Sequence, residues 1–94
     1  MTYNLEFVPS ALKEWEKLGS SIQKQFKNKL EERILRPKVA KDKLRGHPNL
    51  YKIKLRSAGY RLVYEVDDKT ITVLVLAVGK RNRNDVYNTA FERI

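Results

Sequence analysis

Residues 70–78 constrain the fold of this chain more than any other segment, because they are apolar on both alternating faces. A strand with one face in water alternates apolar and polar side chains, whereas a strand buried on both faces does not. Within residues 71–78 the only polar side chain is Thr72. The run is far too short to cross a bilayer, which takes about 20 apolar residues. We therefore predict a central strand of a sheet, ended by Gly79.

Three further segments alternate in the manner of half-buried strands. Residues 2–8, 50–56 and 60–66 each place apolar side chains at every second position. The polar positions of the second segment are all basic: Lys52, Lys54 and Arg56. With the central strand, these segments predict a four-stranded antiparallel sheet.

Two amphipathic helices are predicted between the first and second strands. Ser10 is the expected N-cap of the first helix, and Gly19 ends it. Ser20 and Gln23 have the spacing of a capping box and open the second helix, which stops before Pro37. The short connection between the two helices predicts an antiparallel helical hairpin.

The predicted order of elements is βααβββα, an α+β fold. A basic loop at residues 80–83 leads into a last helix of about ten residues. We expect the N-terminal helical hairpin to pack on the sheet. The length of 94 residues suits one domain, residues 1–94, and leaves no room for two.

The charge of the chain points to a partner that carries many negative charges. There are 20 Lys and Arg against 11 Asp and Glu, for a formal net charge of +9. Residues 47–64 contain no acid and four basic residues: Lys52, Lys54, Arg56 and Arg61. Such a patch favours a polyanion, of which nucleic acid is the usual one. The alternative is a solvated strand face, since lysines on an edge strand also guard against aggregation.

The turn after Arg56 decides whether these cations share a face. If residues 58–59 form a two-residue turn, Arg61 stands opposite Arg56, and Lys52, Lys54 and Arg61 lie on one face. A three-residue turn would place the side chain of Arg61 on the opposite face of the sheet. The two-residue turn is our prediction.

Several kinds of chemistry are excluded by what the chain lacks. It contains no cysteine, which excludes disulfides, thiolate metal sites and a cysteine nucleophile. Its one histidine, His47, leaves almost no basis for a zinc site or a histidine acid–base pair, and we interpret it as a loop residue. We expect no metal and no cofactor. No signal segment opens the sequence, so a cytoplasmic protein is expected.

The loop and helix after the central strand hold further candidates. Lys80 and Arg81 follow Gly79, where a glycine lets the backbone turn sharply toward a ligand. Tyr87, one turn into the last helix, fits two interpretations. It is either ordinary core with its hydroxyl at the surface, or a platform on which an RNA base stacks.

Three stretches of the sequence closely resemble the RelE toxins of bacterial toxin–antitoxin pairs: ALKEWEKLGSSIQKQFKNKL, KLRGHPNLYKIKLRSAGYRLVYEV and VGKRNRNDVY. The resemblance covers essentially the whole chain. It implies a microbial-RNase-like fold of the RelE/ParE superfamily and metal-independent cleavage of mRNA in the ribosomal A site. The implied partners are a RelB-like antitoxin, mRNA and the ribosome with its 16S rRNA. Operator DNA would be contacted only through the antitoxin complex, and no membrane is involved.

The same resemblance assigns roles to individual residues. The implied catalytic positions are Lys52, Lys54, Arg61, Arg81 and Tyr87. The implied RNA contacts are Arg45, Lys52, Lys80 and Arg83. The role of Arg83 stays open, because some relatives have an acid or a histidine there.

Metal-free RNA cleavage uses the neighbouring 2′-hydroxyl as the nucleophile and leaves a 2′,3′-cyclic phosphate. Without a histidine pair, a lysine has to be considered as the base, although free lysine titrates near 10.4. Neighbouring cations lower that value, which favours Lys54 between Lys52 and Arg61. Arg61 and Arg81 would hold the scissile phosphate, Arg81 would protonate the leaving oxygen, and Tyr87 would orient a base.

Two other functions compete with RNA cleavage. A gyrase-inhibiting toxin of the ParE group would share the fold and cut nothing, but it would not need Lys54, Arg61, Arg81 and Tyr87 together. The other is a basic module that binds RNA or the ribosome without catalysis.

Overall fold

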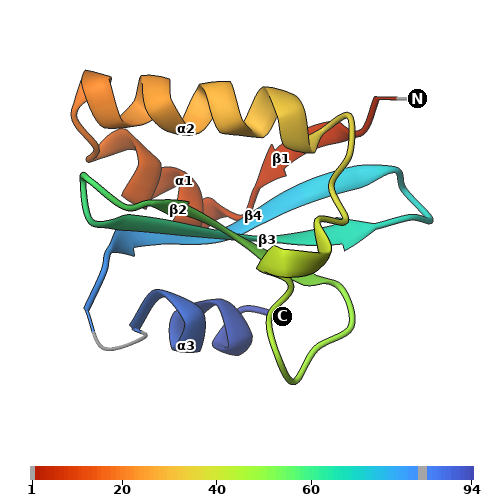
Figure 1. Cartoon of the computed structure of the whole chain (residues 1–94). Helices are drawn as coiled ribbons and strands as arrows, with labels where there is room; N and C mark the ends of the chain where they lie inside the picture. Colours follow the sequence, from red (N-terminus) through yellow and green to blue (C-terminus); the bar gives the residue numbers. More distant parts are fainter. Residues whose placement is uncertain (1, 83–84) are drawn as a thin grey trace.

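The computed structural model describes residues 2–82 and 85–94. Its elements follow the predicted order, with a short 3-10 helix, η1, added before the second strand (Figure 1). They are β1 (Asn4–Phe7), α1 (Pro9–Glu16), α2 (Ser20–Arg33), η1 (Ala40–Asp42), β2 (Leu50–Leu55), β3 (Tyr60–Asp67), β4 (Thr72–Lys80) and α3 (Asp85–Glu92). The α+β class predicted from the sequence is confirmed.

The four strands form one sheet in the order β1-β4-β3-β2, so β4 lies inside the sheet, as its apolar run predicts. β2 pairs antiparallel with β3, and β3 with β4. β1 pairs with β4 in parallel, from Asn4 opposite Thr72 to Phe7 opposite Val75. The expectation of a purely antiparallel sheet is therefore wrong, and the sheet is mixed. Alternation of side chains identifies a strand but does not reveal its direction, and no tight turn joins β1 to β4.

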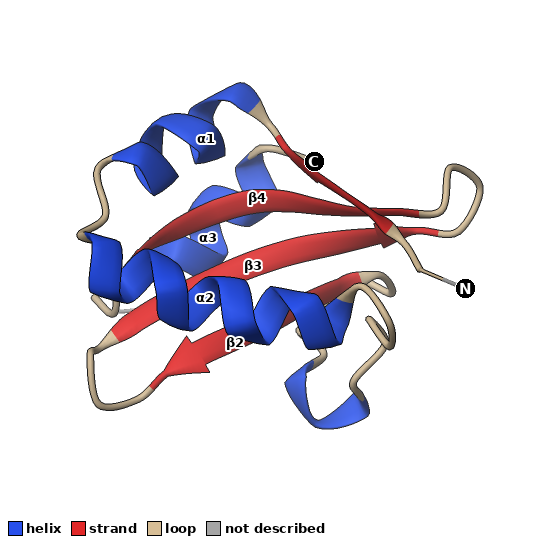
Figure 2. Cartoon of the chain, turned by 90° about the horizontal axis from the view of Figure 1, so that it is seen from above, coloured by secondary structure: helices blue, strands red, loops and turns tan. Residues whose placement is uncertain are grey.

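The helical hairpin and α3 lie on opposite faces of the sheet, above and below it in Figure 1. Figure 2 shows the hairpin from above, with α1 over the β4 side and α2 over the β2 side. Beneath the hairpin is the larger core, which includes Phe26 and Tyr64. The ring of Trp15 lies against the rings of Phe7 and Phe26, with centroids 5.3 and 6.2 Å away. This aromatic packing fixes the hairpin on the sheet.

A smaller core fills the space between the sheet and α3. It consists of Leu44, Leu50, Val63, Leu76, Ala77, Val86 and Ala90. A bulge in the β3–β4 ladder puts Val63 opposite Ala77 but Tyr64 opposite Val75. The extra residue, Leu76, packs on the α3 face together with Ala77. The bulge thus lets β4 supply two adjacent apolar side chains to the smaller core.

Both helices of the hairpin begin without a side-chain cap. Val8 is the N-cap of α1 and Gly19 that of α2, and neither makes a side-chain capping hydrogen bond. The predicted N-cap Ser10 and the capping-box residue Ser20 lie inside the helices, so both capping predictions are wrong. Pro9 instead opens α1, since it has no N–H that needs a partner at the first position of a helix.

Glu14 and Arg93 fasten the end of α3 to α1 and to β4. Arg93 Nη1 and Nη2 donate to Glu14 Oε1 and Oε2 at 2.8 and 3.1 Å. Nη1 also donates to the carbonyl of Leu76 at 2.8 Å, and the N–H of Val78 donates to Glu14 Oε1 at 3.2 Å. The ladder with β1 ends at Val75. This clamp therefore satisfies backbone groups on the β4 edge that β1 does not reach.

The connection between β2 and β3 is longer than predicted. Leu55 pairs with Tyr60, so residues 56–59 form the turn and the predicted two-residue turn at residues 58–59 is wrong. Gly59 adopts a φ of 74°, which favours glycine, and its N–H donates to the carbonyl of Leu55 at 2.8 Å. Both turns contain an even number of residues, so the predicted faces of the two strands are unchanged.

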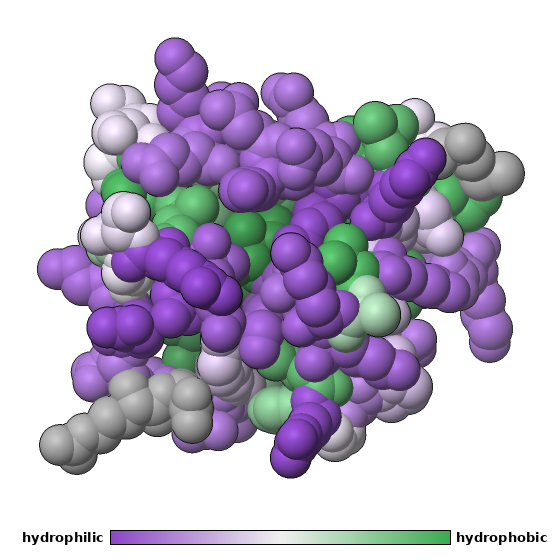
Figure 3. Space-filling view, viewed as in Figure 1, coloured by the Kyte–Doolittle hydropathy of each residue, from purple (hydrophilic) through white to green (hydrophobic). Residues whose placement is uncertain are grey.

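The surface of the molecule is largely polar. Hydrophilic side chains cover most of the face seen in Figure 3, in keeping with a charged fraction of 33%. Among the described residues, the large apolar side chains that are exposed are Leu5, Leu12, Leu35, Phe91 and Ile94. No helix within the described ranges is both long and apolar enough to span a membrane.

Candidate functional site

Alternation along β2 and β3 brings basic side chains to the face that α3 covers. Lys52 and Lys54 line the space beside α3, while Ile53 between them belongs to the core under the hairpin. Arg61 pairs directly with Lys54, and not with Arg56 as predicted. Opposite side chains in such a ladder have Cβ atoms about 5 Å apart. The predicted sharing of one face by Lys52, Lys54 and Arg61 is confirmed.

These three cations line a cleft of about 280 Å³ between the sheet and the start of α3. The loop after β4 and the first turn of α3 supply the other wall. The described residues around it are Lys52, Lys54, Arg61, Arg81, Asn82, Asp85, Val86 and Tyr87. Two strands, β2 and β3, together with the loop after β4 and helix α3, thus bring together the five side chains that the resemblance to RelE toxins implies as catalytic.

Arg81 is held at the rim of the cleft by its own backbone. Its N–H donates to the carbonyl of Gly59 at 2.6 Å, which joins the loop after β4 to the β2–β3 turn. The turn begins just beyond Lys54 on β2 and ends just before Arg61 on β3. This hydrogen bond therefore sets the position of Arg81 relative to those two cations, while its side chain stays exposed.

Tyr87 lies where the cleft meets the smaller core. Its half-buried ring packs against that core. The Nζ atom of Lys52 lies 5.8 Å from the centroid of the ring, within the range of a cation–π contact. Tyr87 thus borders the core, as one of the two interpretations expected, and it also lines the cleft, where the stacking of a base stays a prediction.

The surroundings of Lys54 favour its neutral form. The positive charge of Lys52 is the largest cause that lowers the pKa of Lys54 below the usual lysine value, followed by partial burial. Arg61 and Arg56 lower this pKa further, whereas the carboxylate of Asp42 acts in the opposite direction. Because the pKa of Lys54 is lowered, a larger fraction of this amine can accept a proton at neutral pH.

Arg61 is a nearly buried cation. It is 8% exposed, and among the described residues no carboxylate forms a salt bridge with it. Its Nη1 donates to the carbonyl of Tyr60 at 3.1 Å. A buried charge without a counter-ion opposes folding, and an anion that entered the cleft would offset this cost. The cleft is therefore electrostatically prepared for an anionic ligand.

Two lining residues, Asn82 and Asp85, were missed in the sequence analysis. Asp85 is the first residue of α3, where free backbone N–H groups favour a carboxylate. An acid at this place looks like an ordinary helix-start residue, so the sequence offered no signal that it also faces the basic cleft. Asn82 lies in the basic loop before α3, where the sequence analysis selected only basic residues as candidates.

The remaining candidates lie elsewhere. Arg45 is exposed in the connection between η1 and β2 and is not among the described cleft residues. Lys80 lines a different hollow, of about 290 Å³, which also includes Glu14. Arg83 lies outside the described residues. In His47, Nδ1 accepts a hydrogen bond from the backbone of Asn49 at 3.1 Å, consistent with a loop residue.

The cleft has no ligand set for a metal ion. Its only described carboxylate comes from Asp85. Over residues 2–82 and 85–94, no three His, Cys, Asp or Glu side chains come together as potential metal ligands. What the cleft does offer is a set of hydrogen-bond donors and positive charges, which suits a phosphate group.

Comparison with known proteins places the chain in a toxin family. The family model of the ParE toxin of the type II toxin–antitoxin system, parDE, matches residues 5–85. The mRNA interferase toxin RelE of Escherichia coli K12 is 54% identical over 94 residues, which span 100% of this chain and 99% of the relative.

Solved structures agree with this assignment. A mutant of E. coli toxin RelE in the free state superposes with a TM-score of 0.92 at 52% identity, covering 100% of this chain and 99% of that one. The toxin in the intact E. coli RelBE toxin–antitoxin complex matches with a TM-score of 0.83 at 54% identity, covering 86% of this chain and 99% of that one. The chain therefore belongs to the RelE family of toxins of type II toxin–antitoxin systems, within the RelE/ParE superfamily.

Proposed function

We propose that this protein is a metal-independent endoribonuclease that cleaves mRNA in the ribosomal A site and so inhibits translation. The observation that supports the proposal most is the convergence of Lys52, Lys54, Arg61, Arg81 and Tyr87 on one cleft. A toxin that inhibits gyrase by binding it has no need for this cluster. The name of the E. coli relative, an mRNA interferase toxin, points the same way.

The chemistry follows from the positions of these side chains. The neutral amine of Lys54 takes the proton of the 2′-hydroxyl, whose oxygen then forms a bond to the adjacent phosphorus. Arg61 neutralises the charge that develops on the phosphate. The bond from phosphorus to the 5′-oxygen breaks as Arg81 donates a proton to that oxygen. The products are a 2′,3′-cyclic phosphate and a 5′-hydroxyl.

The other two residues of the cluster prepare the substrate. The ring of Tyr87 stacks on or orients the base beside the cut, and Lys52 acts through its charge on both that ring and Lys54. Such a weak acid–base pair depends on how the RNA is held. A ribosome that presents the message in a bent geometry would supply this, with Arg45, Lys80 and Arg83 as further RNA contacts.

The proposed partners follow from the charge and the relatives. The E. coli relative forms a complex with RelB, so we expect a RelB-like antitoxin that is acidic or amphipathic. It should cover the basic cleft or displace α3, which carries Tyr87. Operator DNA would be contacted through this complex, and 16S rRNA on the ribosome. These partners imply a cytoplasmic location.

Induction of the protein in cells tests the proposal directly. A translated reporter message should be cut within codons, as mapped by primer extension, while plasmid supercoiling stays normal. Lys54→Ala should abolish the cuts, and Lys24→Ala, which changes an exposed lysine of α2, should not. Altered supercoiling with intact messages would favour gyrase inhibition. Ribosome binding without cuts would favour the non-catalytic module.

A further inference from the structure

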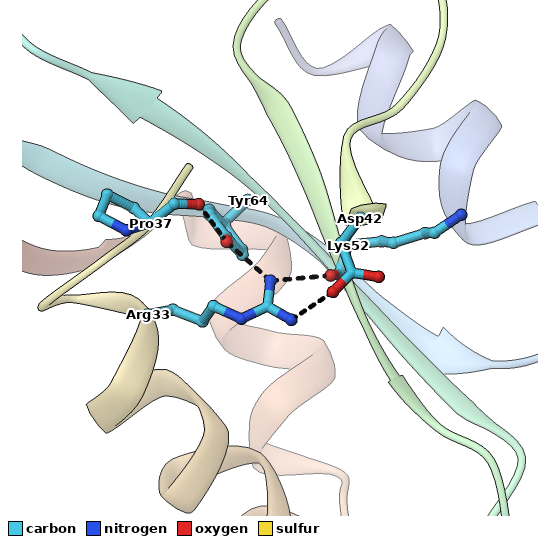
Figure 4. A network of polar contacts seen from close by, with 5 residues as sticks. All are labelled: Arg33, Pro37, Asp42, Lys52 and Tyr64. Atoms are coloured by element: carbon cyan, nitrogen blue, oxygen red, sulfur yellow. Dashed lines mark hydrogen bonds and ion pairs between the residues drawn. The ribbon is translucent and has the colours of Figure 1, made fainter. Parts of the chain in front are cut away.

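Arg33 is the centre of a polar network on the far side of β2 from the cleft (Figure 4). It comes from the last turn of α2, and its Nη1 donates to the carbonyl of Lys52 at 3.1 Å and to Tyr64 Oη at 2.9 Å. Its Nη2 donates to Asp42 Oδ2 at 2.6 Å. Arg33 therefore connects α2 and η1 to the edge strand β2, which it contacts at Lys52, a residue that lines the cleft.

The network is largely buried. The side chains of Arg33 and Asp42 are 11% and 17% exposed. Tyr64 Oη donates to the carbonyl of Pro37 at 2.6 Å, and the guanidinium of Arg33 lies 5.8 Å from the centroid of the Tyr64 ring. The hydrogen bond from Arg33 to Asp42, 2.6 Å long, is charge-assisted, and such bonds are among the strong ones in proteins. Asp42 is thus held firmly in one position.

Asp42 and Lys54 nevertheless face a common space. A hollow of about 440 Å³ runs along the outer edge of β2, and Arg33, Asp42 and Lys54 all line it. Lys54 also lines the cleft on the other side, because it stands on the edge strand between the two. An acid on the hollow side is therefore able to act on Lys54, and Asp42 does raise its pKa, although less than the cations lower it.

Charged groups from every neighbouring element surround Lys54. They are Lys52 on β2, Arg56 in the turn after it, Arg61 on β3, Lys29 and Arg33 on α2, Lys41 and Asp42 in η1, Arg81 after β4 and Asp85 on α3. The acids of this set are Asp42 and Asp85. Of the two, Asp42 is fixed by a partner of its own, Arg33.

We propose that Arg33 is a positioning residue for Lys54, which holds the Asp42 carboxylate and the Lys52 carbonyl and so prevents Asp42 from forming an ion pair with the lysine. The inference rests on the proposed function, in which Lys54 is the base. Arginine stays charged at every accessible pH, so Asp42 keeps its partner whenever it is ionised. Without Arg33, the Asp42 carboxylate would be left among the other cations that line the hollow, which include Lys54.

An ion pair with Asp42 would disable the base. An opposite charge within about 4–6 Å shifts a pKa by roughly 1–3 units toward the charged form. At a fixed pH below the pKa of Lys54, each unit of increase lowers the neutral fraction, and with it the cleavage rate, about tenfold. Arg33→Met should therefore cleave roughly 10–1,000 times more slowly at neutral pH, and its rate should recover as the pH is raised.

The test compares Arg33→Met, Asp42→Asn and the double variant with the wild type. The pKa of Lys54 is measured by NMR on the 13Cε of labelled lysine, assigned with Lys54→Arg, and single-turnover cleavage on ribosomes is measured against pH. Arg33→Met should raise the pKa of Lys54, and Asp42→Asn in the same chain should bring both the pKa and the rate back. A purely structural role of Arg33 predicts the opposite, a double variant that is no better than Arg33→Met.

Asp42→Asn alone keeps the inference testable if Arg33→Met does not fold. Asparagine still accepts a hydrogen bond from Arg33, and the lost negative charge should lower the pKa of Lys54. An unchanged or raised pKa in this variant would overturn the inference. The NMR measurement needs no cleavage, so the inference about Arg33 and the proposed nuclease activity fail separately: a wild type that does not cut refutes only the activity.

Discussion

Lys54 and Arg61 stand directly opposite each other on β2 and β3, on the face of the sheet that α3 covers. Like charges in this relationship destabilise the strand pair, and they also favour loss of a proton from the lysine. Together with Lys52, which is the largest cause, this pairing lowers the pKa of Lys54, on which the proposed role of this lysine as the base depends. Both effects, on the stability of the fold and on the pKa of Lys54, can be tested.

Lys54→Arg should separate the two possible roles of this residue. Arginine keeps the positive charge but cannot accept a proton, because its pKa stays above about 12. Single-turnover cleavage on ribosomes should fall by roughly 10²–10⁴, the usual contribution of a general base, while ribosome binding changes little. Lys24→Arg is the control. If Lys54→Arg cuts at the wild-type rate and Lys54→Ala does not, Lys54 contributes only its charge.

Lys54→Gln should stabilise the protein while it abolishes cleavage. The pKa of Lys54 is lowered in the folded state, mainly by Lys52, so the charged amine is disfavoured there relative to the unfolded chain. The penalty is fully present below the folded pKa and disappears as the pH rises through the ordinary lysine range. Urea unfolding should show a higher midpoint for Lys54→Gln at pH 7 and a smaller difference near pH 11. A lower midpoint at pH 7 would contradict the electrostatic account.

A single deoxyribose at the cleaved position should prevent cutting. The proposed nucleophile is the 2′-hydroxyl of that ribose, so its removal leaves no atom to attack the phosphate. Cleavage of the normal message should continue with EDTA present during the chemical step, and its 3′ end should carry a cyclic phosphate. Mass spectrometry of the 3′ fragment checks this. Cleavage of the deoxy message, or a linear phosphate from the start, would exclude the mechanism.

Glu14→Ala should loosen α3. The change removes both hydrogen bonds that Arg93 donates to Glu14 and leaves the N–H of Val78 without its acceptor. Hydrogen bonds to charged groups contribute about 1.5–3 kcal/mol, and the partial exposure of this pair favours the lower end. Urea unfolding should therefore show a loss of about 1–2 kcal/mol, with faster hydrogen exchange in α3.

Cleavage by Glu14→Ala should also slow down, because α3 carries Tyr87 into the cleft. The matched control is Glu16→Ala, an exposed residue of the same helix with no salt bridge in the described part of the chain. Equal hydrogen exchange of α3 in both variants would show that the clamp does not hold the helix.

The sequence predicted the faces of the strands better than the ends of the elements. Alternation assigned Lys52, Lys54 and Arg61 to one face correctly, and that result survived a wrong turn length because only the parity of the turn matters. The direction of β1 was not predictable, since a parallel and an antiparallel strand show the same alternation. The predicted helix starts at Ser10 and Ser20 were each slightly late. In the structure α1 begins at Pro9, and Gly19 is the N-cap of α2 without a side-chain capping hydrogen bond.

Residues of the site could be predicted only where the local sequence pattern or the family resemblance identified them. Arg81 and Tyr87 were candidates from their positions in the sequence, but only the family resemblance implied catalytic roles for them, and the pattern alone left Tyr87 between the core and a platform for a base. Asp85 was missed because a helix start accounts for its presence without any function. The contact between Arg33 and Asp42 depends on how α2 ends and η1 folds back, and neither residue type signals a partner in a chain so rich in charge.

The separation of the two cores by the sheet has a consequence for how this protein can change. Residues on opposite faces, such as Phe26 beneath the hairpin and Leu76 beneath α3, belong to different cores. Free-energy effects of substitutions at such distant sites add, whereas those of neighbours in one core do not. Mutations around the cleft therefore leave the stability supplied by Phe26 and its neighbours intact. Substitutions on the α3 face can therefore alter the cleft without removing the packing of the larger core.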